Sequence, residues 1–216
     1  MRYLLPFVLI PALVALSVTV FGDRMYLAIS FLIAALAVLL FLIGIEQKNL
    51  GARRMVLVAV MTALTVIGRF IPFFKPVTAL TVIAALYLGA ESGFLVGALS
   101  ALLSNFYFGQ GPWTPFQMLS WGLIGLVAGY LSRPLLRHRA LLLMYGVLSG
   151  AVFSLIMDVW TVIWYSGSFS WGLYLAAAVS ALPYTLLYAV SNLVFLLVLG
   201  RPFGEKLSRI KKKYGI

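Results

Sequence analysis

The stretch SGFLVGALSALLSNFYFGQGPWTPFQMLSWGLIGLVAGYLS, residues 92–132, contains no Asp, Glu, Lys or Arg. Two further stretches, 25–45 and 159–200, also lack these four residue types. A helix that crosses a bilayer needs about 20 apolar residues, and each stretch is at least that long. Lipid offers backbone groups no hydrogen-bond partners, so such stretches must form helices. The sequence therefore predicts an all-α integral membrane protein.

The composition supports this class. The 216 residues are 63% hydrophobic and 10% charged, and the mean hydropathy is +1.09. A soluble domain carries about 25% charged residues. The net charge of +11 does not indicate a nucleic-acid partner, because most Lys and Arg separate apolar runs, which is the orientation signal of membrane proteins. We interpret the dense basic run at 201–213 as a lipid-facing tail.

Apolar runs of suitable length predict about eight spans. They lie at 3–21, 26–45, 55–71, 76–90, 92–107, 116–132, 140–165 and 171–199. The first run lacks a convincing cleavage site, so we interpret it as a spanning helix and not as a signal peptide. Between the fourth and fifth spans the only available turn is GAESG, residues 89–93. Without that turn, 76–107 would be one bent helix and the chain would have seven spans.

The basic residues favour eight spans over seven. With eight, the clusters around 48–54, 133–139 and 201–213 fall on one side, whereas seven spans would split them. The positive-inside rule makes that side cytoplasmic. We therefore expect a multi-pass protein of the prokaryotic plasma membrane with both termini in the cytoplasm.

Small residues recur at four-residue spacing, which places them on one helix face where backbones can approach closely. The sets are Ala59 and Ala63; Gly89, Gly93 and Gly97; Gly125 and Gly129; Gly146 and Gly150. Ordinary packing within the chain explains most such faces. At least one face could dock a separate membrane subunit.

The sequence offers little material for catalysis. It has no cysteine, no HExxH, no Cys/His cluster and no GxxxxGK[ST] phosphate loop, and its one histidine, His138, lies in an Arg-rich loop. We therefore predict no enzyme, no catalytic residue, no metal site and no cofactor on this chain. Transport driven by its own ATP hydrolysis is excluded as well.

A thin set of polar groups falls in the predicted outer half of the bundle, and an ionisable group at membrane depth indicates function by default. The set is Arg69, Asn105, Thr114, Gln117, Asp158 and Tyr184. Asp158 has two open interpretations, a structural ion pair with Arg69 and a ligand-binding or proton-relay carboxylate. We interpret Asn192 as an interhelical hydrogen bond. The outer loops carry Trp113 and Trp164, which suit either an interfacial aromatic belt or a lid.

Four segments resemble the substrate-binding S components of energy-coupling factor (ECF) vitamin transporters. RRMVLVAVMTAL at 53–64 resembles the first core helix, with its Ala-x-x-x-Ala face after basic residues. YLGAESGFLVGA at 87–98 is similar to the second and third core helices. GPWTPFQM at 111–118, followed by WGLIG at 121–125, resembles the fourth and is most similar to the cobalamin branch.

The resemblance implies an organisation and a mechanism. Residues 51–200 would form the six-helix substrate-binding core, 1–50 two additional helices, and 201–216 a basic cytoplasmic tail. The core would bind a vitamin from outside and dock through Ala59 and Ala63 on a transmembrane T subunit. Two ABC ATPase partners would use the ATP, and the core would topple in the bilayer to release the vitamin inward.

Within this hypothesis, we expect seven polar and aromatic residues to line the cavity. They are Arg69, Asn105, Trp113, Gln117, Asp158, Trp164 and Tyr184. Cobalamin or a related corrinoid is the predicted ligand, since its amide side chains suit Asn and Gln, although a smaller vitamin fits the same residues. A stand-alone proton-coupled transporter that uses Asp158 is the alternative. A membrane enzyme acting on lipids is the weakest hypothesis, because no catalytic constellation supports it.

Overall fold

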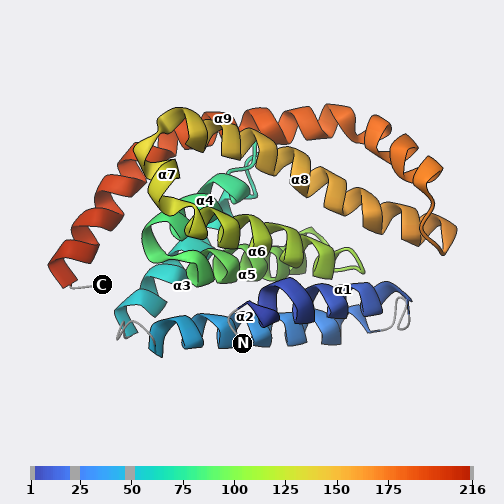
Figure 1. Cartoon of the computed structure of the whole chain (residues 1–216), viewed down its shortest axis with the longest axis horizontal. Helices are drawn as coiled ribbons and strands as arrows, with labels where there is room; N and C mark the ends of the chain where they lie inside the picture. Colours follow the sequence, from blue (N-terminus) through green and yellow to red (C-terminus); the bar gives the residue numbers. More distant parts are fainter. Residues whose placement is uncertain (1–2, 20–24, 47–51, 215–216) are drawn as a thin grey trace.

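The computed structural model describes residues 3–19, 25–46 and 52–214, and the described residues form helices joined by short loops (Figure 1). The helices are a π-helical turn η1 (Leu5–Leu9), α1 (Ile10–Thr19), α2 (Tyr26–Glu46), α3 (Ala52–Gly68), α4 (Val77–Leu88), α5 (Ala90–Phe108), α6 (Thr114–Tyr130), α7 (Ser132–Arg137), α8 (Arg139–Ser166) and α9 (Trp171–Tyr214). The predicted all-α fold is confirmed for this part of the chain.

Each predicted span overlaps a helix, but the number of membrane crossings stays a prediction. Three helices within the described ranges are long and apolar enough to cross a membrane: Tyr26–Gly44, Arg139–Ser166 and Trp171–Tyr214. Helices Leu5–Ser17 and Val77–Leu88 are apolar but shorter. At 1.5 Å per residue, the 12 residues of α4 reach only about 18 Å, against a hydrocarbon core of about 30 Å.

The short α4 lies at the centre of the bundle. Eleven of its residues, from Val77 to Leu88 with Tyr87 excepted, are buried, and it packs against α3, α5, α6 and α9. A helix enclosed by protein does not need to match the thickness of the lipid. This position explains why an apolar run too short for a span still forms a stable helix.

The chain reverses at Gly89 alone, a tighter turn than the predicted GAESG segment. Gly89 has φ +100°, a conformation that favours glycine, and Ala90 already belongs to α5. A Cβ built on Gly93 would lie 2.4 Å from the Cβ of Ala85, so residues four positions on either side of Gly89 are in contact. Residues 76–107 are therefore two helices, and the single bent helix is excluded. The predicted placement of Glu91 in the turn is wrong, because it lies in the first turn of α5 and is fully buried.

Most of the small-residue faces pack within the chain. A Cβ on Gly97 would lie 2.4 Å from the Trp121 carbonyl oxygen, which shows how closely α5 and α6 approach. Gly129 meets Ala90 and Gly150 meets Ala189 in the same way. Ala59 and Ala63 differ, since both are exposed on the outer face of α3. The described fold thus leaves one small-residue face uncovered.

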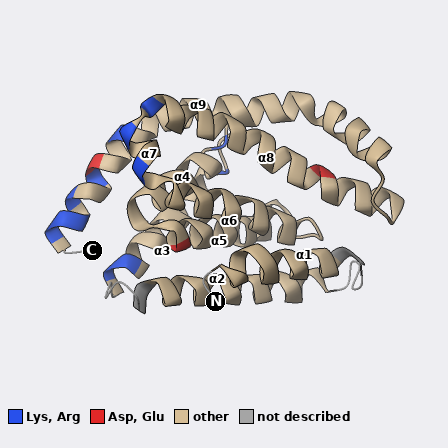
Figure 2. Cartoon of the chain, in the orientation of Figure 1, with Lys and Arg blue, Asp and Glu red and all other residues tan. Residues whose placement is uncertain are grey.

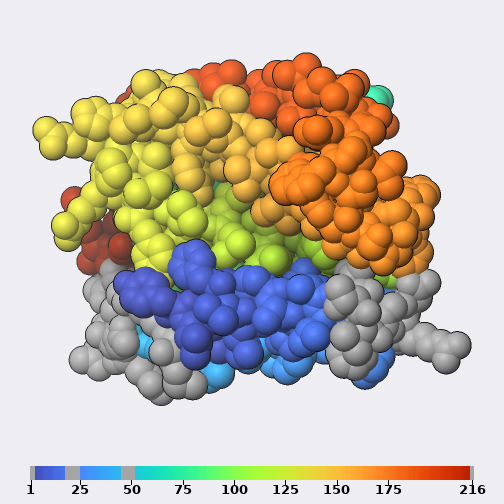
Figure 3. All heavy atoms as spheres, turned by 45° about the vertical axis from the view of Figure 1, so that its right-hand side comes forward, coloured from blue at the N-terminus to red at the C-terminus, as the bar shows by residue number. Residues whose placement is uncertain are grey.

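The N-terminal helices pack on the core and do not stand apart from it. The hairpin of η1, α1 and α2 covers one side of α5 and α6, where Figure 3 shows it in blue against the green helices. Close contact at one end of α2 brings Gly44 to the side chain of Glu91 and Phe41 to the guanidinium of Arg54, 5.6 Å from the ring centroid.

The long helices α8 and α9 form a hairpin that packs on α4 and α6 (Figure 1). Helix α9 does not end at residue 199 but continues to Tyr214, so the predicted basic tail is helical over 201–214. Its last part turns towards the start of α3, where Arg53 donates a 3.0 Å hydrogen bond to the Tyr214 carbonyl. Pro202 opens this segment, and a proline inside a helix favours a bend.

The described basic residues gather at one end of the bundle. Figure 2 shows Lys and Arg at the start of α3, around α7 and along the last part of α9. A further basic patch lies in the loop between α3 and α4. This grouping agrees with the expected cytoplasmic clusters, while the orientation itself stays a prediction.

Candidate functional site

A polar network joins the end of α3 to α5 and α6. Arg69 follows α3, and its Nη1 donates hydrogen bonds to the Ser104 hydroxyl and, at 2.6 Å, to Oδ1 of Asn105. The Asn105 amide nitrogen then donates to the Thr114 hydroxyl at 2.8 Å and to Oε1 of Gln117 at 2.9 Å. Three of the predicted site residues, Arg69, Asn105 and Gln117, are thus brought together.

Local backbone signals create this junction. Gly109, with φ +105°, ends α5 and turns the chain, and Pro115 lies in the first turn of α6, where proline is well tolerated. Gln110 in the intervening loop accepts a hydrogen bond from Thr114 at 3.0 Å and donates one to the Leu102 carbonyl at 2.9 Å. The loop therefore holds Asn105 and Gln117 at a fixed separation.

Aromatic rings surround the cationic groups of this junction. The Arg69 guanidinium carbon lies 5.1 Å from the Phe108 ring centroid and 5.3 Å from that of Trp121. The Lys75 ammonium lies 5.5 Å from the same Phe108 ring. Burial, and secondarily the charge of Arg69, lower the pKa of the Lys75 ammonium below its usual value. Two cations in one site favour an anionic or carbonyl-bearing ligand group.

A small cavity adjoins the network between α4, α6, α8 and α9. Its volume is about 40 Å³, and it is lined by Arg69, Lys75, Val77, Thr78, Gln117, Trp121, Phe153, Tyr188 and Asn192. Such a volume holds a few water molecules, whereas ligand pockets usually measure 300–1,000 Å³. The cavity is therefore too small for a vitamin-sized ligand in this structure, and such a ligand would require it to widen.

The lining chemistry suits binding more than catalysis. Among the described residues that line the cavity none is acidic, and the described chain contains no group of His, Asp or Glu side chains that could hold a metal ion. Trp121 and Phe153 stack with centroids 4.9 Å apart and planes 10° apart, and Tyr188 meets Phe153 edge-on at 5.3 Å. Such rings give a planar ligand a stacking surface.

Trp113 and Trp164 belong to a second aromatic group, next to the network. Both contact Trp160, with ring centroids 5.8 Å apart in each case. Within the described chain, the buried Nε1 of Trp160 has no hydrogen-bond partner. A buried donor without an acceptor is costly, and Trp160 is not among the residues that line the cavity.

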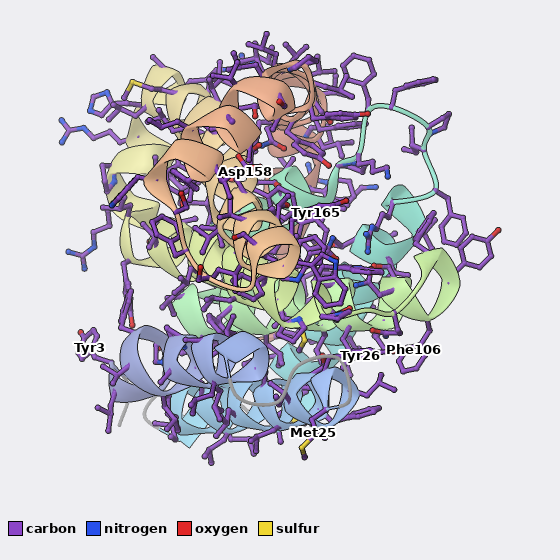
Figure 4. All side chains as sticks on the ribbon, turned by 90° about the vertical axis from the view of Figure 1, so that its right-hand side faces the viewer. Tyr3, Met25, Tyr26, Phe106, Asp158 and Tyr165 are labelled. Atoms are coloured by element: carbon purple, nitrogen blue, oxygen red, sulfur yellow. The ribbon has the colours of Figure 1, made fainter. Side chains whose placement is uncertain are left out.

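Asp158 lies apart from the cationic groups. Its side chain is 7% exposed, and within the described ranges no ion pair joins it to Arg69, so the structural interpretation of this pair is wrong. Figure 4 shows Asp158 and Tyr165 in the α8–α9 part of the molecule, away from Met25 and Tyr26. The carboxylate is buried between these two helices and not in the cavity.

Tyr184 also lies outside the cavity, because its side chain is 65% exposed on α9. One turn later on the same helix, Tyr188 lines the cavity where Tyr184 was predicted to do so. Asn192 donates the predicted interhelical hydrogen bond, to the Gly146 carbonyl at 2.9 Å, and lines the cavity as well. Sequence reasoning missed Lys75, Thr78, Trp121, Phe153 and Tyr188 as lining residues. The only signal for Tyr188 was its four-residue spacing from Tyr184.

The described residues thus form a helical bundle, with apolar helices long enough to cross a membrane, around a small cavity lined by cationic, polar and aromatic side chains. The sequence matches the family described as ECF-type riboflavin transporter, S component, over residues 49–209, and the chain belongs to this family. The match begins after α2 and includes the whole cavity lining. Comparison with curated proteins and with solved structures finds no match.

Proposed function

We propose that the chain is the riboflavin-binding subunit of an ECF-type importer. The observation that carries this proposal is the Arg69–Asn105–Gln117 network at the wall of the cavity. The family match, which covers that network, supports a flavin in place of the corrinoid expected from the sequence. Riboflavin combines a flat ring system that carries two carbonyl groups with a chain of hydroxyl groups.

Each part of such a ligand has a counterpart in the lining. The cationic side chains of Arg69 and Lys75 would attract the ring carbonyls, since none of the described residues that line the cavity is acidic. Trp121, Phe153 and Tyr188 provide aromatic faces for the ring system. The side chains of Gln117, Thr78 and Asn192 can exchange hydrogen bonds with hydroxyl groups.

In this proposal, the cavity opens when the α8–α9 hairpin moves away from α4 and α6. Phe153, Tyr188 and Asn192 come from this hairpin, while the remaining lining residues come from α4, α6 and the loop before α4. A tilt of the hairpin would separate Phe153 from Trp121 and leave a flat slot between them. The Lys75 carbonyl, which accepts a 3.0 Å hydrogen bond from Ser191, would have to be released.

The remaining parts of the proposal concern the partners and the membrane. A transmembrane T subunit and two ABC ATPase subunits would supply the energy, and the exposed Ala59 and Ala63 face of α3 would dock on the T subunit. The protein would lie in the prokaryotic plasma membrane with both termini in the cytoplasm. The chain itself needs no cofactor for binding.

Calorimetry on the purified full chain in detergent tests the ligand, with riboflavin, flavin mononucleotide and cobalamin as probes. Saturable riboflavin binding, reduced in Arg69→Gln and unchanged in Arg137→Gln, is the expected result. Arg137 is a matched control because it lies at the other, basic end of the bundle, in α7. Binding of cobalamin without binding of riboflavin would overturn the flavin assignment.

The burial of Asp158 favours a second candidate, a proton-coupled transporter that works alone. Vesicles that contain only this chain and carry a pH gradient would then accumulate riboflavin, and Asp158→Asn would abolish the uptake. Uptake that appears only after the T subunit and ATPases are added, and that survives Asp158→Asn, would exclude this candidate.

A further inference from the structure

A second, larger hollow lies at the basic end of the molecule. It involves α4, α8 and α9, as the cavity does, but the two share no lining residue. It is a groove of about 400 Å³ between the end of α4, α7, the start of α8 and the last third of α9. Figure 2 shows Lys and Arg concentrated on these same segments of α7 and α9. The proposed binding function makes no use of this groove.

The floor of the groove is apolar. Leucines from three helices line it: Leu135 and Leu136 of α7, Leu142 and Leu143 of α8, and Leu196 and Leu197 of α9. Leu135 and Leu196 are buried, while Leu136 and Leu197 are exposed. A water-filled groove with this floor would be unfavourable, so the surface suits a hydrocarbon chain.

The rim of the groove is charged. Arg139, at the start of α8, and Arg201 on α9 are the basic residues, with Glu205 and Ser208 beside them. Arg201 donates a 2.9 Å hydrogen bond to Glu205 one turn away, but their side chains are 88% and 52% exposed. An ion pair so open to solvent holds its partners weakly. The Arg201 guanidinium can therefore exchange Glu205 for another anion.

The shape of the groove depends on a close contact between α4 and α9. A Cβ on Gly204 would lie 2.2 Å from the Tyr87 hydroxyl oxygen, so the Tyr87 side chain packs directly against α9 at this glycine. Leu207, about one turn later on α9, is also buried. The segment after Pro202 is thus held across the basic end of the bundle, and the groove lies inside the resulting bend.

From this arrangement we propose that the groove binds one anionic phospholipid. The phosphate lies between Arg139 and Arg201, with Ser208 as a hydrogen-bond donor, and an acyl chain covers the leucines. Basic pockets between membrane helices at the headgroup level are suited to this class of ligand. A soluble phosphate compound would leave the apolar floor exposed to water. The inference does not depend on the identity of the vitamin.

Native mass spectrometry of the full chain, released from vesicles with equal amounts of phosphatidylglycerol and phosphatidylcholine, tests the proposal. We expect wild type to retain one phosphatidylglycerol in preference to phosphatidylcholine. Each arginine contributes about fivefold to binding at an anionic surface, so Arg139→Gln with Arg201→Gln should weaken retention by about 25-fold. Removing the competing carboxylate in Glu205→Gln should strengthen retention.

The control is Arg137→Gln with Lys212→Gln, which removes the same charge from the same end of the molecule but outside the groove. Retention in the control should stay within about twofold of wild type. Equal losses in the groove and control variants would show a diffuse electrostatic effect and overturn the proposal. So would equal retention of the two lipids, or a groove occupied by a co-purifying protein segment. Riboflavin binding by the wild type and all three variants, measured in parallel, distinguishes failure of this inference from failure of the proposed function.

Discussion

Helix α3 has an arginine near each end, and the two have opposite surroundings. Arg54, in its first turn, is 1% exposed; its Nε donates to the Ser92 hydroxyl at 3.1 Å, and its guanidinium faces Phe41. The buried carboxylate Glu91 belongs to the same junction of α2, α3 and α5. Arg69, just past the other end, contacts amide, hydroxyl and aromatic groups at the edge of a cavity whose described lining has no acid.

The comparison separates a cation enclosed by packing from a cation to which the proposed function assigns a role in binding. A charge buried beside an opposite charge and covered by another helix has its solvation replaced permanently by protein. A charge beside a cavity that has no anionic partner, and that shares its site with a second cation, keeps capacity for an anionic or carbonyl group of a ligand. Burial alone does not distinguish these two kinds of arginine, whereas the chemical groups around each guanidinium do.

The largest effect is expected at the enclosed end. Arg54→Met removes the cation from the junction that also buries the Glu91 carboxylate. We expect the two charges to compensate each other, and breaking such a buried pair typically costs about 3–5 kcal/mol. The free energy of unfolding in mixed detergent micelles should fall by about this amount, and the protein that remains folded should bind riboflavin normally. Arg53→Met, an exposed neighbour, is the control. Equal stabilities of the two variants would remove the distinction between the ends of α3.

Arg69→Gln should show the reverse pattern. Hydrogen bonds to charged groups contribute about 1.5–3 kcal/mol, so riboflavin affinity should fall roughly 10- to 100-fold. Unfolding should change less than in Arg54→Met, because Asn105 keeps Thr114 and Gln117 as partners. Calorimetry and unfolding on the same preparation measure both. A variant that unfolds readily but binds with wild-type affinity would assign Arg69 to packing.

A double-variant cycle sharpens the difference between the two arginines. Combining Arg54→Met with Glu91→Leu removes both charges, and the loss of stability should be smaller than the sum of the single losses by about 0.5–3 kcal/mol. Unfolding of the four proteins gives this coupling. Additive losses would mean that Arg54 and Glu91 do not share one electrostatic environment.

The outer arginine could be predicted from the sequence, and the inner one could not. Arg69 ends an apolar run and was expected with Asn105 and Gln117 in the outer half of the bundle, so expected membrane depth alone selected it as a candidate, and the structure places it at the cavity. Arg54 looked like an orientation signal in a cytoplasmic cluster, and Glu91 like a turn residue. Their burial depends on the extra helix α2 covering them, and no pattern within 52–91 specifies that contact.

The same limit applies to the cavity and to the helices. Hydropathy predicted where helices lie because periodicity and turns are local properties of the chain. Asp158 and Tyr184 were predicted to face the cavity on depth alone, whereas the rotation of α8 and α9 about their axes turns them elsewhere. Phe153 and Tyr188 carry no signal of their own, since an aromatic residue in an apolar helix is ordinary core material.

The smallest effect on stability is expected between the two arginines, on the exposed face of α3. Ala59→Leu adds a side chain to a surface that nothing in the described chain covers, so unfolding should change by no more than about 0.5 kcal/mol. Riboflavin affinity should stay unchanged, because Arg69 lies beyond the other end of the helix. Co-purification with the T subunit should be lost, since close helix packing requires small residues. Val60→Leu, one position away and also exposed, is the control. Complex formation by Ala59→Leu at the wild-type level would place the docking surface elsewhere, and α3 would then have distinct roles only at its ends.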